Sequence, residues 1–275
     1  VFVDIEEDTF NIDFKEIEKK ISSKTRAIIT VDLFGHPSNY KELNKIAKKY
    51  KIKIISDSAQ SIASKYKGKY CATIGDIGGI SLNGHKHIQT GEGGVLFTND
   101  HKIAHKLRLI RNHGEQVFNP QNKKKLINII GFNFRMGEIE AAIGIEQLKK
   151  LKKIIRKKQI LANYLTKNLK NLKNLKTPYI EKGNTHVYYC YPIQIEGSSN
   201  LKKKIFKALI KEGIPIEDRY ENLMEYNIYK NKNIKKIFPW KISNRKNFYK
   251  KNSNVYKNVD NLLKNKFLSI PFCSY

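Results

Sequence analysis

The sequence predicts an α/β fold, in which a large domain holds a mostly parallel sheet and a smaller α+β domain follows. Residues 26–31 and 52–55 are short, largely apolar runs of the kind that form buried strands. The segments at 38–50 and 100–111 have the mixed apolar and lysine-rich pattern of amphipathic helices. Because strands that alternate with such helices are typical of parallel sheets, we expect helices on both faces of the sheet.

Capping residues locate the elements of the first half of the chain. Asp13, with Glu16 three residues later, has the pattern of a capping box and predicts a helix to about residue 22. Ser38 predicts the N-cap of a second helix that reaches about residue 50. Residues 93–100 predict a strand that ends at Asn99 or Asp100, one of which is the N-cap of a third helix that reaches Arg111.

A long amphipathic helix and a polar break define the predicted domains. The helix begins at Gly137, reaches about Leu169 and is interpreted as the connection between the domains. A polar stretch with a proline follows, so we place the boundary near Lys173, between a large domain 1–172 and a small C-terminal domain 173–275. Strand, helix and strand are predicted at 186–195, 199–213 and 267–272. The tyrosine-rich segment 219–251 predicts a surface loop, or else aromatic rings that stack on a nucleotide base.

One lysine and one aspartate suggest a cofactor. Lys86 lies between a strand-like run and the glycines of GEGG, which let the backbone approach a bound group closely. Asp57 ends a buried strand, at the end where open α/β sheets bind ligands. A lysine can form a Schiff base with pyridoxal phosphate and later carry a proton, while a carboxylate keeps the pyridine nitrogen protonated. Taken singly, such a lysine is more often a surface residue and such an aspartate a turn or capping residue.

Six segments, in this order and spacing, resemble the DegT/DnrJ/EryC1/StrS family of nucleotide-sugar aminotransferases. They are VFVDIEEDTFNID, VDLFGHPSNY, SDSAQSIASKYKGK, GDIGGISLNGHKHIQTGEGG, LRLIRNHGE and GFNFRMGEIEAAIGIEQL. The resemblance is close over roughly the first 165 residues and looser beyond. It implies fold type I of the pyridoxal-phosphate enzymes and a homodimer with active sites at the interface. It also implies transfer of an amino group from glutamate or glutamine to a keto-sugar nucleotide, for amino-sugar or surface-polysaccharide biosynthesis.

The same resemblance implies roles for five residues. Lys86 matches the Schiff-base lysine and Asp57 the partner of the pyridine nitrogen. Gln60 matches a glutamine that approaches the ring hydroxyl, and Ser81 a serine that reaches the cofactor phosphate. Asn133 matches an asparagine that crosses the dimer interface toward the partner's cofactor. The large domain is therefore expected to bind pyridoxal phosphate.

Two other functions are weighed against transamination. A related subgroup carries histidine in place of the lysine and dehydrates a sugar; His85 and His87 flank Lys86 here, but counting back from GEGG places Lys86 at the catalytic position. The histidines are interpreted as pocket-lining residues without an assigned role. A non-catalytic, truncated basic protein is the third possibility, and it leaves the ordered series Asp57, Gln60, Ser81 and Lys86 unexplained.

The resemblance also predicts that the chain is part of a longer protein. In the family, strands and helices precede the segment that matches Val1 onward, and they supply a phosphate-binding turn and a stacking aromatic. We therefore expect the 275 residues alone to lack activity.

Composition excludes several classes of function. The formal charge is +28, but the lysines are spread along every segment rather than gathered in one patch, so no nucleic-acid partner is predicted. Cys71, Cys190 and Cys273 have no metal-ligand spacing and are too few for a disulfide framework. No signal peptide and no apolar run of membrane-spanning length is present, which predicts a cytoplasmic protein without a membrane partner.

Overall fold

A computed structural model describes residues 1–115, 129–230 and 256–272, which form two compact units. The first unit contains Val1–Lys20, Thr166–Tyr179 and Tyr191–Pro271, and the second contains Ile21–Leu165, Ile180–Cys190 and the segment from Phe272. Cys273 and residues 231–251 of the tyrosine-rich segment lie outside the described residues.

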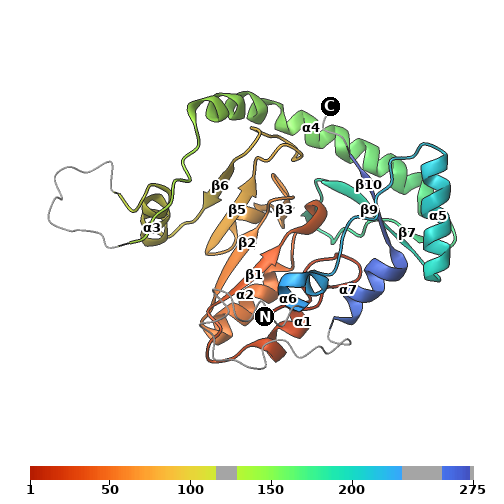
Figure 1. Ribbon diagram of the computed structural model, residues 1–275, viewed down its shortest axis with the longest axis horizontal. Helices are drawn as coiled ribbons and strands as arrows, with labels where there is room; N and C mark the ends of the chain where they lie inside the picture. Colours follow the sequence, from red (N-terminus) through yellow and green to blue (C-terminus); the bar gives the residue numbers. More distant parts are fainter. Residues whose placement is uncertain (116–128, 231–255, 273–275) are drawn as a thin grey trace. The chain divides into compact units, whose positions relative to one another are not determined.

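The second unit is built on a four-stranded sheet in the order β1-β2-β5-β6 (Figure 1). The strands are β1 (Ala27–Val31), β2 (Lys53–Asp57), β5 (Ile77–Ser81) and β6 (Gly94–Phe97). β1, β2 and β5 are parallel, while β6 is antiparallel to β5. The predicted mostly parallel sheet is therefore confirmed, and the carboxyl ends of three strands meet at one edge.

The two faces of this sheet are not equally covered. Ile28, Thr30 and Ile54 are buried on one face, where α2 (Tyr40–Tyr50) contacts β2. On the other face, Ile29 is 63% exposed and Leu96 59% exposed. The expectation of helices on both faces is wrong for the described part of the chain: side chains alternate across a strand, and only one set is covered.

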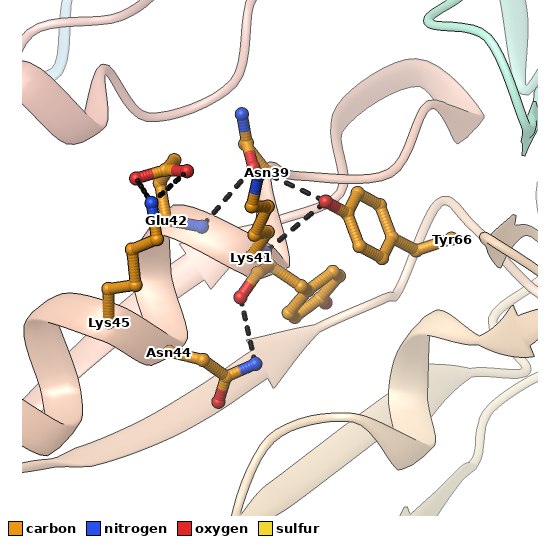
Figure 2. Close-up of polar contacts among 7 residues, drawn as sticks. Asn39, Lys41, Glu42, Asn44, Lys45 and Tyr66 are labelled. Carbon is orange, nitrogen blue, oxygen red and sulfur yellow. Dashed lines mark hydrogen bonds and ion pairs between the residues drawn. The ribbon is translucent and has the colours of Figure 1, made fainter.

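The N-terminus of α2 is capped by Asn39, one residue later than predicted. Asn39 Oδ1 accepts a hydrogen bond from the Glu42 amide at 3.3 Å and one from the Tyr66 hydroxyl at 3.4 Å (Figure 2). Ser38 is fully buried instead, and its hydroxyl donates to the Val31 carbonyl at 3.1 Å. The prediction of Ser38 as the cap was therefore wrong. Serine and asparagine are both favourable N-cap residues, and here the Ser38 hydroxyl forms a tertiary hydrogen bond instead of capping the helix.

Short elements complete the second unit. β3 (Lys65–Tyr66), β4 (Lys69–Tyr70) and β8 (Asn184–Thr185) form a small sheet in the order β4-β3-β8. The 3-10 turn η3 (Cys71–Thr73) directly follows β4, and the 3-10 turn η2 (Leu33–Gly35) follows β1. α3 (His101–Arg111) begins at Asp100, whose side chain accepts hydrogen bonds from the amides of Lys102 and Ile103. The predicted strand, cap and helix in this region are confirmed.

The long helix α4 (Glu138–Leu169) has nearly its predicted bounds. Its residues Leu151 and Ile154 pack on a buried cluster of Ile62, Leu82 and Ile88. The N-terminal part of the helix differs, since Ile139 is 75% exposed and Leu148 61% exposed. Only part of the apolar stripe is therefore packed against the described residues of this chain.

The first unit is α+β, as predicted for the smaller domain. Its strands are β7 (Leu175–Lys176), β9 (Cys190–Ile195) and β10 (Phe267–Pro271), in the order β10-β9-β7. Its helical elements are α1 (Phe14–Ile17), η1 (Glu18–Lys20), α5 (Ser199–Lys211), η5 (Leu223–Glu225), α6 (Asn227–Lys230), α7 (Lys257–Asn261) and η8 (Leu262–Lys266). Asp13 caps α1 through the Lys15 amide, but the helical part ends at Lys20, earlier than predicted.

The first twenty residues belong to the same unit as the later part of the chain. Asp4 accepts hydrogen bonds from the amides of Asn258 and Val259 at 3.0 and 3.1 Å, and the rings of Phe10 and Phe267 meet edge to face. The division at residues 172 and 173 stays a prediction. Within the described ranges, no helix combines the length and apolarity needed to cross a membrane.

Candidate active site

Three acidic or hydroxyl side chains lie where the parallel strands end. Asp57 is the last residue of β2, Ser81 is the last residue of β5, and Asp32 directly follows β1. In the strand register, Val31 is paired with Asp57 and Asp57 with Gly79. The edge of the sheet at which open α/β folds bind ligands is therefore lined with polar groups in this chain.

Asp57 and Lys86 are brought together at this edge. Asp57 is half-buried, and its Oδ1 accepts a hydrogen bond from the Ala59 amide at 3.0 Å. Its negative charge acts on Lys86, where it opposes the lowering of the lysine pKa by burial. The structure thus places one carboxylate and one amine in electrostatic contact, although three strands, β3, β4 and β5, separate them in sequence.

Lys86 lies in a loop that is closed by backbone hydrogen bonds. The Leu82 amide donates to the Gly93 carbonyl at 2.9 Å, and the Thr90 amide donates to the Leu82 carbonyl at 2.8 Å. Gly93 has φ 151°, and a Cβ there would lie 2.8 Å from Thr90 Oγ1, so this closure requires glycine. Leu82 and Ile88 anchor the loop in the core cluster, which leaves Lys86 half-buried between them.

The environment of Lys86 shifts its protonation equilibrium toward the uncharged amine. Burial lowers the pKa of Lys86, and the charge of Asp57 opposes that change without cancelling it. A lysine must be an uncharged amine to act as a nucleophile. Lys86 Nζ also lies 4.9 Å from the centre of the Tyr189 ring.

Gln60 and Ser81 are held by backbone amides. Gln60 Oε1 accepts a hydrogen bond from the Phe34 amide at 2.9 Å, and Ser81 Oγ accepts one from the Asn83 amide at 3.2 Å. Both side chains are half-buried. Their positions fit polar contacts to a ligand at the strand ends, while the particular atoms they would contact stay predictions.

Asn133 lies in an exposed extended segment before α4. It forms an isolated antiparallel bridge with Asn112, and the Arg135 guanidinium donates to Asn112 Oδ1 at 2.8 Å. Stacked rings of Phe132 and Phe134, with centres 5.0 Å apart, flank Asn133 in sequence. Its predicted role at a partner's cofactor stays a prediction.

Sequence reasoning missed Asp32. Its carboxylate is fully buried and accepts hydrogen bonds from the Ser38 amide, the Tyr40 hydroxyl and the Ser58 hydroxyl at 2.8, 2.8 and 2.6 Å. Burial raises the pKa of Asp32 to about 6, although these hydrogen bonds oppose the rise. Its position directly after an apolar strand, the same signal that identified Asp57, would have found it.

The two histidines beside Lys86 have different environments. His85 is exposed, whereas His87 is 1% exposed and its Nε2 donates to the Val187 carbonyl at 2.9 Å. Burial, together with the nearby charge of Lys158, lowers the pKa of His87 to about 4. Within residues 1–115, 129–230 and 256–272, no group of three or more His, Cys, Asp and Glu side chains is arranged to hold a metal ion.

The side chains at the strand edge are of the chemical types that bind pyridoxal phosphate. A half-buried amine can hold its aldehyde carbon, and a carboxylate at the same edge can hold a proton on the ring nitrogen. The glycine-closed loop and the Ser81 hydroxyl add polar groups close to the backbone. The residues at the strand edge are therefore compatible with this cofactor.

Known proteins share both the sequence and the fold. Residues 1–246 match the model of the DegT/DnrJ/EryC1/StrS aminotransferase family. GDP-perosamine synthase of Caulobacter vibrioides is 33% identical over 216 residues, which cover 78% of this chain and 57% of that protein. The chain thus spans little more than half the length of this curated relative.

Two solved structures are also similar. An aminotransferase of this family from Brucella abortus has a TM-score of 0.80 and 29% identity, over 100% of this chain and 68% of that one. GDP-4-keto-6-deoxy-D-mannose-3-dehydratase from E. coli, with bound hydrated PLP, has a TM-score of 0.79 and 28% identity, over 100% of this chain and 70% of that one. From the extent of these matches, this chain belongs to the DegT/DnrJ/EryC1/StrS aminotransferase family.

Proposed function

We propose that the protein is a pyridoxal-phosphate-dependent aminotransferase, which moves an amino group from glutamate or glutamine to a keto-sugar nucleotide. The observation that carries this proposal is the half-buried Lys86, which has a lowered pKa and lies in electrostatic contact with Asp57. Similarity to GDP-perosamine synthase supports the substrate class.

Each residue has a defined task in this proposal. When bound, pyridoxal phosphate supplies an electron sink for negative charge at the reacting carbon. Lys86 would hold the cofactor and, once released, would carry a proton between the substrate carbon that bears the nitrogen and the former aldehyde carbon of the cofactor. Asp57 keeps the proton on the pyridine nitrogen. Gln60 and Ser81 orient the ring hydroxyl and the phosphate, and Asn133 contacts the cofactor of a partner subunit.

Transamination is favoured over sugar dehydration because Lys86, and neither of the two flanking histidines, occupies the expected catalytic position. The chain is similar to a dehydratase as well as to an aminotransferase, so fold alone does not separate the reactions. His85 is exposed, and His87 is buried and donates to a backbone carbonyl. Lys86, by contrast, is in electrostatic contact with Asp57, and its lowered pKa suits a nucleophilic amine.

A homodimer is part of the proposal. Phe132 is 51% exposed and Phe134 66% exposed, and these stacked rings lie on either side of Asn133. Such an apolar group is typical of a surface that becomes covered in an assembly. We also propose a cytoplasmic location, a role in amino-sugar or surface-polysaccharide biosynthesis, and no nucleic-acid or membrane partner.

Borohydride trapping tests the site and product analysis tests the reaction. The full-length protein is loaded with pyridoxal phosphate, reduced with borohydride and digested, and mass spectrometry identifies the labelled lysine. We expect the label on Lys86, and we expect an amino sugar nucleotide from a keto-sugar nucleotide and glutamate. Label on another lysine contradicts the site, and a deoxygenated product supports the dehydratase. A protein without visible cofactor absorption supports the non-catalytic alternative.

Substitution of Lys86 provides the matched activity test. Lys86→Ala removes both the attachment point and the proton carrier, so we expect turnover to fall by about 10³-fold or more. Lys69→Ala, at an exposed lysine of β4, is the control and should keep the full rate. Retained activity in Lys86→Ala would remove Lys86 from the mechanism.

Mixed subunits test the shared site. If Asn133 serves the partner's cofactor, verified hybrids of inactive Asn133→Ala and inactive Lys86→Ala subunits contain one site with both residues intact. We expect such hybrids to recover part of the activity. Inactive hybrids would show that both residues serve a site within one chain.

A further inference from the structure

The strongest unassigned contact at the strand edge is between Lys86 and Tyr189. Lys86 Nζ lies 4.9 Å from the centre of the tyrosine ring, within the range of a cation–π interaction. Tyr189 is half-buried and comes from the segment before the fully buried part of β9. Its ring also lies 6.3 Å from the ring of His87, so it lies beside the loop that carries Lys86.

The backbone that presents Tyr189 is held in an unfavourable conformation. Tyr188 has φ 52°, in the left-handed region that non-glycine residues seldom adopt. Its amide donates to His186 Nδ1 at 2.9 Å, and the His186 and Tyr188 rings stack with centres 4.1 Å apart. Backbone strain of this kind persists only where surrounding contacts require it, and it is most common at functional sites.

Neutral histidines fix the same segment at three points. Besides the bond from the Tyr188 amide to His186, His87 Nε2 donates to the Val187 carbonyl, and the Glu181 amide donates to His36 Nε2 at 3.3 Å. Burial lowers the pKa of His36 and of His87 to about 4, and it lowers the pKa of His186 well below its usual value. The rings therefore remain uncharged at neutral pH, and each keeps the tautomer that its hydrogen bond requires.

The turn η2 also holds the segment of Tyr189, through two backbone hydrogen bonds. The Tyr189 amide donates to the Phe34 carbonyl at 2.8 Å, and the Val187 amide donates to the Gly35 carbonyl at 3.0 Å. Phe34 is the residue whose amide also donates to Gln60. One residue thus fixes both Gln60 and Tyr189 relative to the strand edge.

We propose that Tyr189 is a positioning residue for Lys86. The face of the Tyr189 ring receives the lysine ammonium when Lys86 is released and has taken up a proton. This inference rests on the proposed function, in which Lys86 is the reacting lysine. An aromatic face attracts a cation without binding it to one fixed oxygen, so the lysine can return as an amine. The strained segment His186–Tyr189 keeps that face beneath the amine.

Competitive acetylation of Lys86 tests this role without turnover. The full-length protein is stripped of cofactor with hydroxylamine and treated with trace acetic anhydride from pH 6 to 11, and mass spectrometry of the Lys86 peptide gives its titration curve. Tyr189→Phe keeps the ring face and should leave the curve unchanged. Tyr189→Leu keeps an apolar side chain but removes the face, and we expect the pKa of Lys86 to fall by about one unit, a tenfold larger amine fraction.

The chain offers a matched control for the labelling. Lys65 Nζ lies 4.7 Å from the ring of Tyr70, which is 50% exposed, so Tyr70→Leu removes a similar ring from a site away from Lys86. Tyr70→Leu should leave the titration of Lys86 unchanged. If Tyr189→Leu does not fold, by circular dichroism, Tyr189→Met takes its place.

The outcomes separate this inference from the proposed function. An unchanged or raised pKa of Lys86 in Tyr189→Leu overturns the inference, and so does a changed curve in Tyr189→Phe. In the holoenzyme, we expect Tyr189→Leu to lower kcat about tenfold with little change in KM. An active Lys86→Ala variant would overturn the proposed function instead, whatever the labelling shows.

Discussion

The strand edge around Lys86 and the open face of the same sheet differ in how buried and exposed groups are distributed. At the edge, buried polar groups such as Asp32 and His87 have hydrogen-bond partners within the chain. On the open face, apolar side chains such as Ile29 and Leu96 are exposed. The edge therefore has the character of a preorganised site, and the open face that of a surface suited to contact with other apolar groups.

Substitution of Asp57 gives the largest expected effect on the edge. Asp57→Asn keeps the size of the side chain but cannot hold a proton on the pyridine nitrogen, so we expect kcat to fall by about 10²-fold with altered cofactor absorption. Asp8→Asn, at an exposed residue of the other unit, is the control. A wild-type rate and spectrum in Asp57→Asn would show that Asp57 does not pair with the ring.

Acid should destabilise the edge through its histidines. In the folded protein, the pKa of His36 and of His87 falls from 6.5 to about 4, so the folded state binds fewer protons than the unfolded chain. Their contribution to stability is present above pH 6.5 and is lost as the pH falls toward 4. Asp32 acts in the opposite direction, since its pKa rises from 3.8 to about 6 and its contribution is lost as the pH rises through 6.

The histidines outnumber the aspartate, so acid has a net cost. We expect the free energy of unfolding to fall by roughly 4 kcal/mol between pH 7 and pH 4 from His36 and His87 less Asp32, and the lowered pKa of His186 adds to this fall. Urea unfolding at several pH values measures it. His87→Gln should flatten the profile, whereas His105→Gln, at an exposed residue of α3, should not. Equal profiles for His87→Gln and the unsubstituted protein would show that His87 is not buried as a neutral ring.

Alanine substitutions at two glycines distinguish two causes of lost stability, steric crowding at the strand edge and an unfavourable backbone conformation. Gly35 has φ 101°, and a Cβ there would lie 2.8 Å from the Tyr188 amide nitrogen. Gly68 has φ 85° with nothing within 4 Å of its Cβ position. We expect Gly35→Ala to lower the free energy of unfolding by roughly 3 kcal/mol and Gly68→Ala by about 1 kcal/mol. Equal losses in thermal or urea unfolding would show that η2 does not press on the Tyr188 segment.

The smallest effect on stability is expected on the open face. Ile29→Lys replaces an exposed apolar side chain, so the free energy of unfolding should change by less than about 0.5 kcal/mol. Self-association of the 275-residue chain, measured by light scattering, should decrease because an apolar patch is interrupted. Thr25→Lys, at an intermediate position outside the sheet, controls for added charge. A large loss of stability in Ile29→Lys would show that this face is packed.

Local patterns predicted much of this molecule. The cap and bounds of α3, the length of α4 and the placement of Asp57 and Lys86 at the strand ends follow from residue periodicity and turn chemistry near each element. The association of Lys86 with Tyr189 could not be predicted in this way, because it joins segments far apart in sequence. The same holds for the buried histidines, whose partners are backbone atoms of a distant segment. Ser38 was misassigned because a tertiary contact decided between two adjacent capping residues.

Phe34 uses both of its peptide groups in the site, and this has a dynamic consequence. Its amide donates to Gln60, and its carbonyl accepts from the amide of Tyr189. A single local opening of η2 would expose both amide protons at once. Hydrogen exchange at Phe34 and Tyr189 is therefore expected to proceed at one common free energy of opening. A ligand that immobilises Gln60 would slow hydrogen exchange at Tyr189. Binding of that ligand could therefore be detected at Tyr189, a residue that the ligand does not contact.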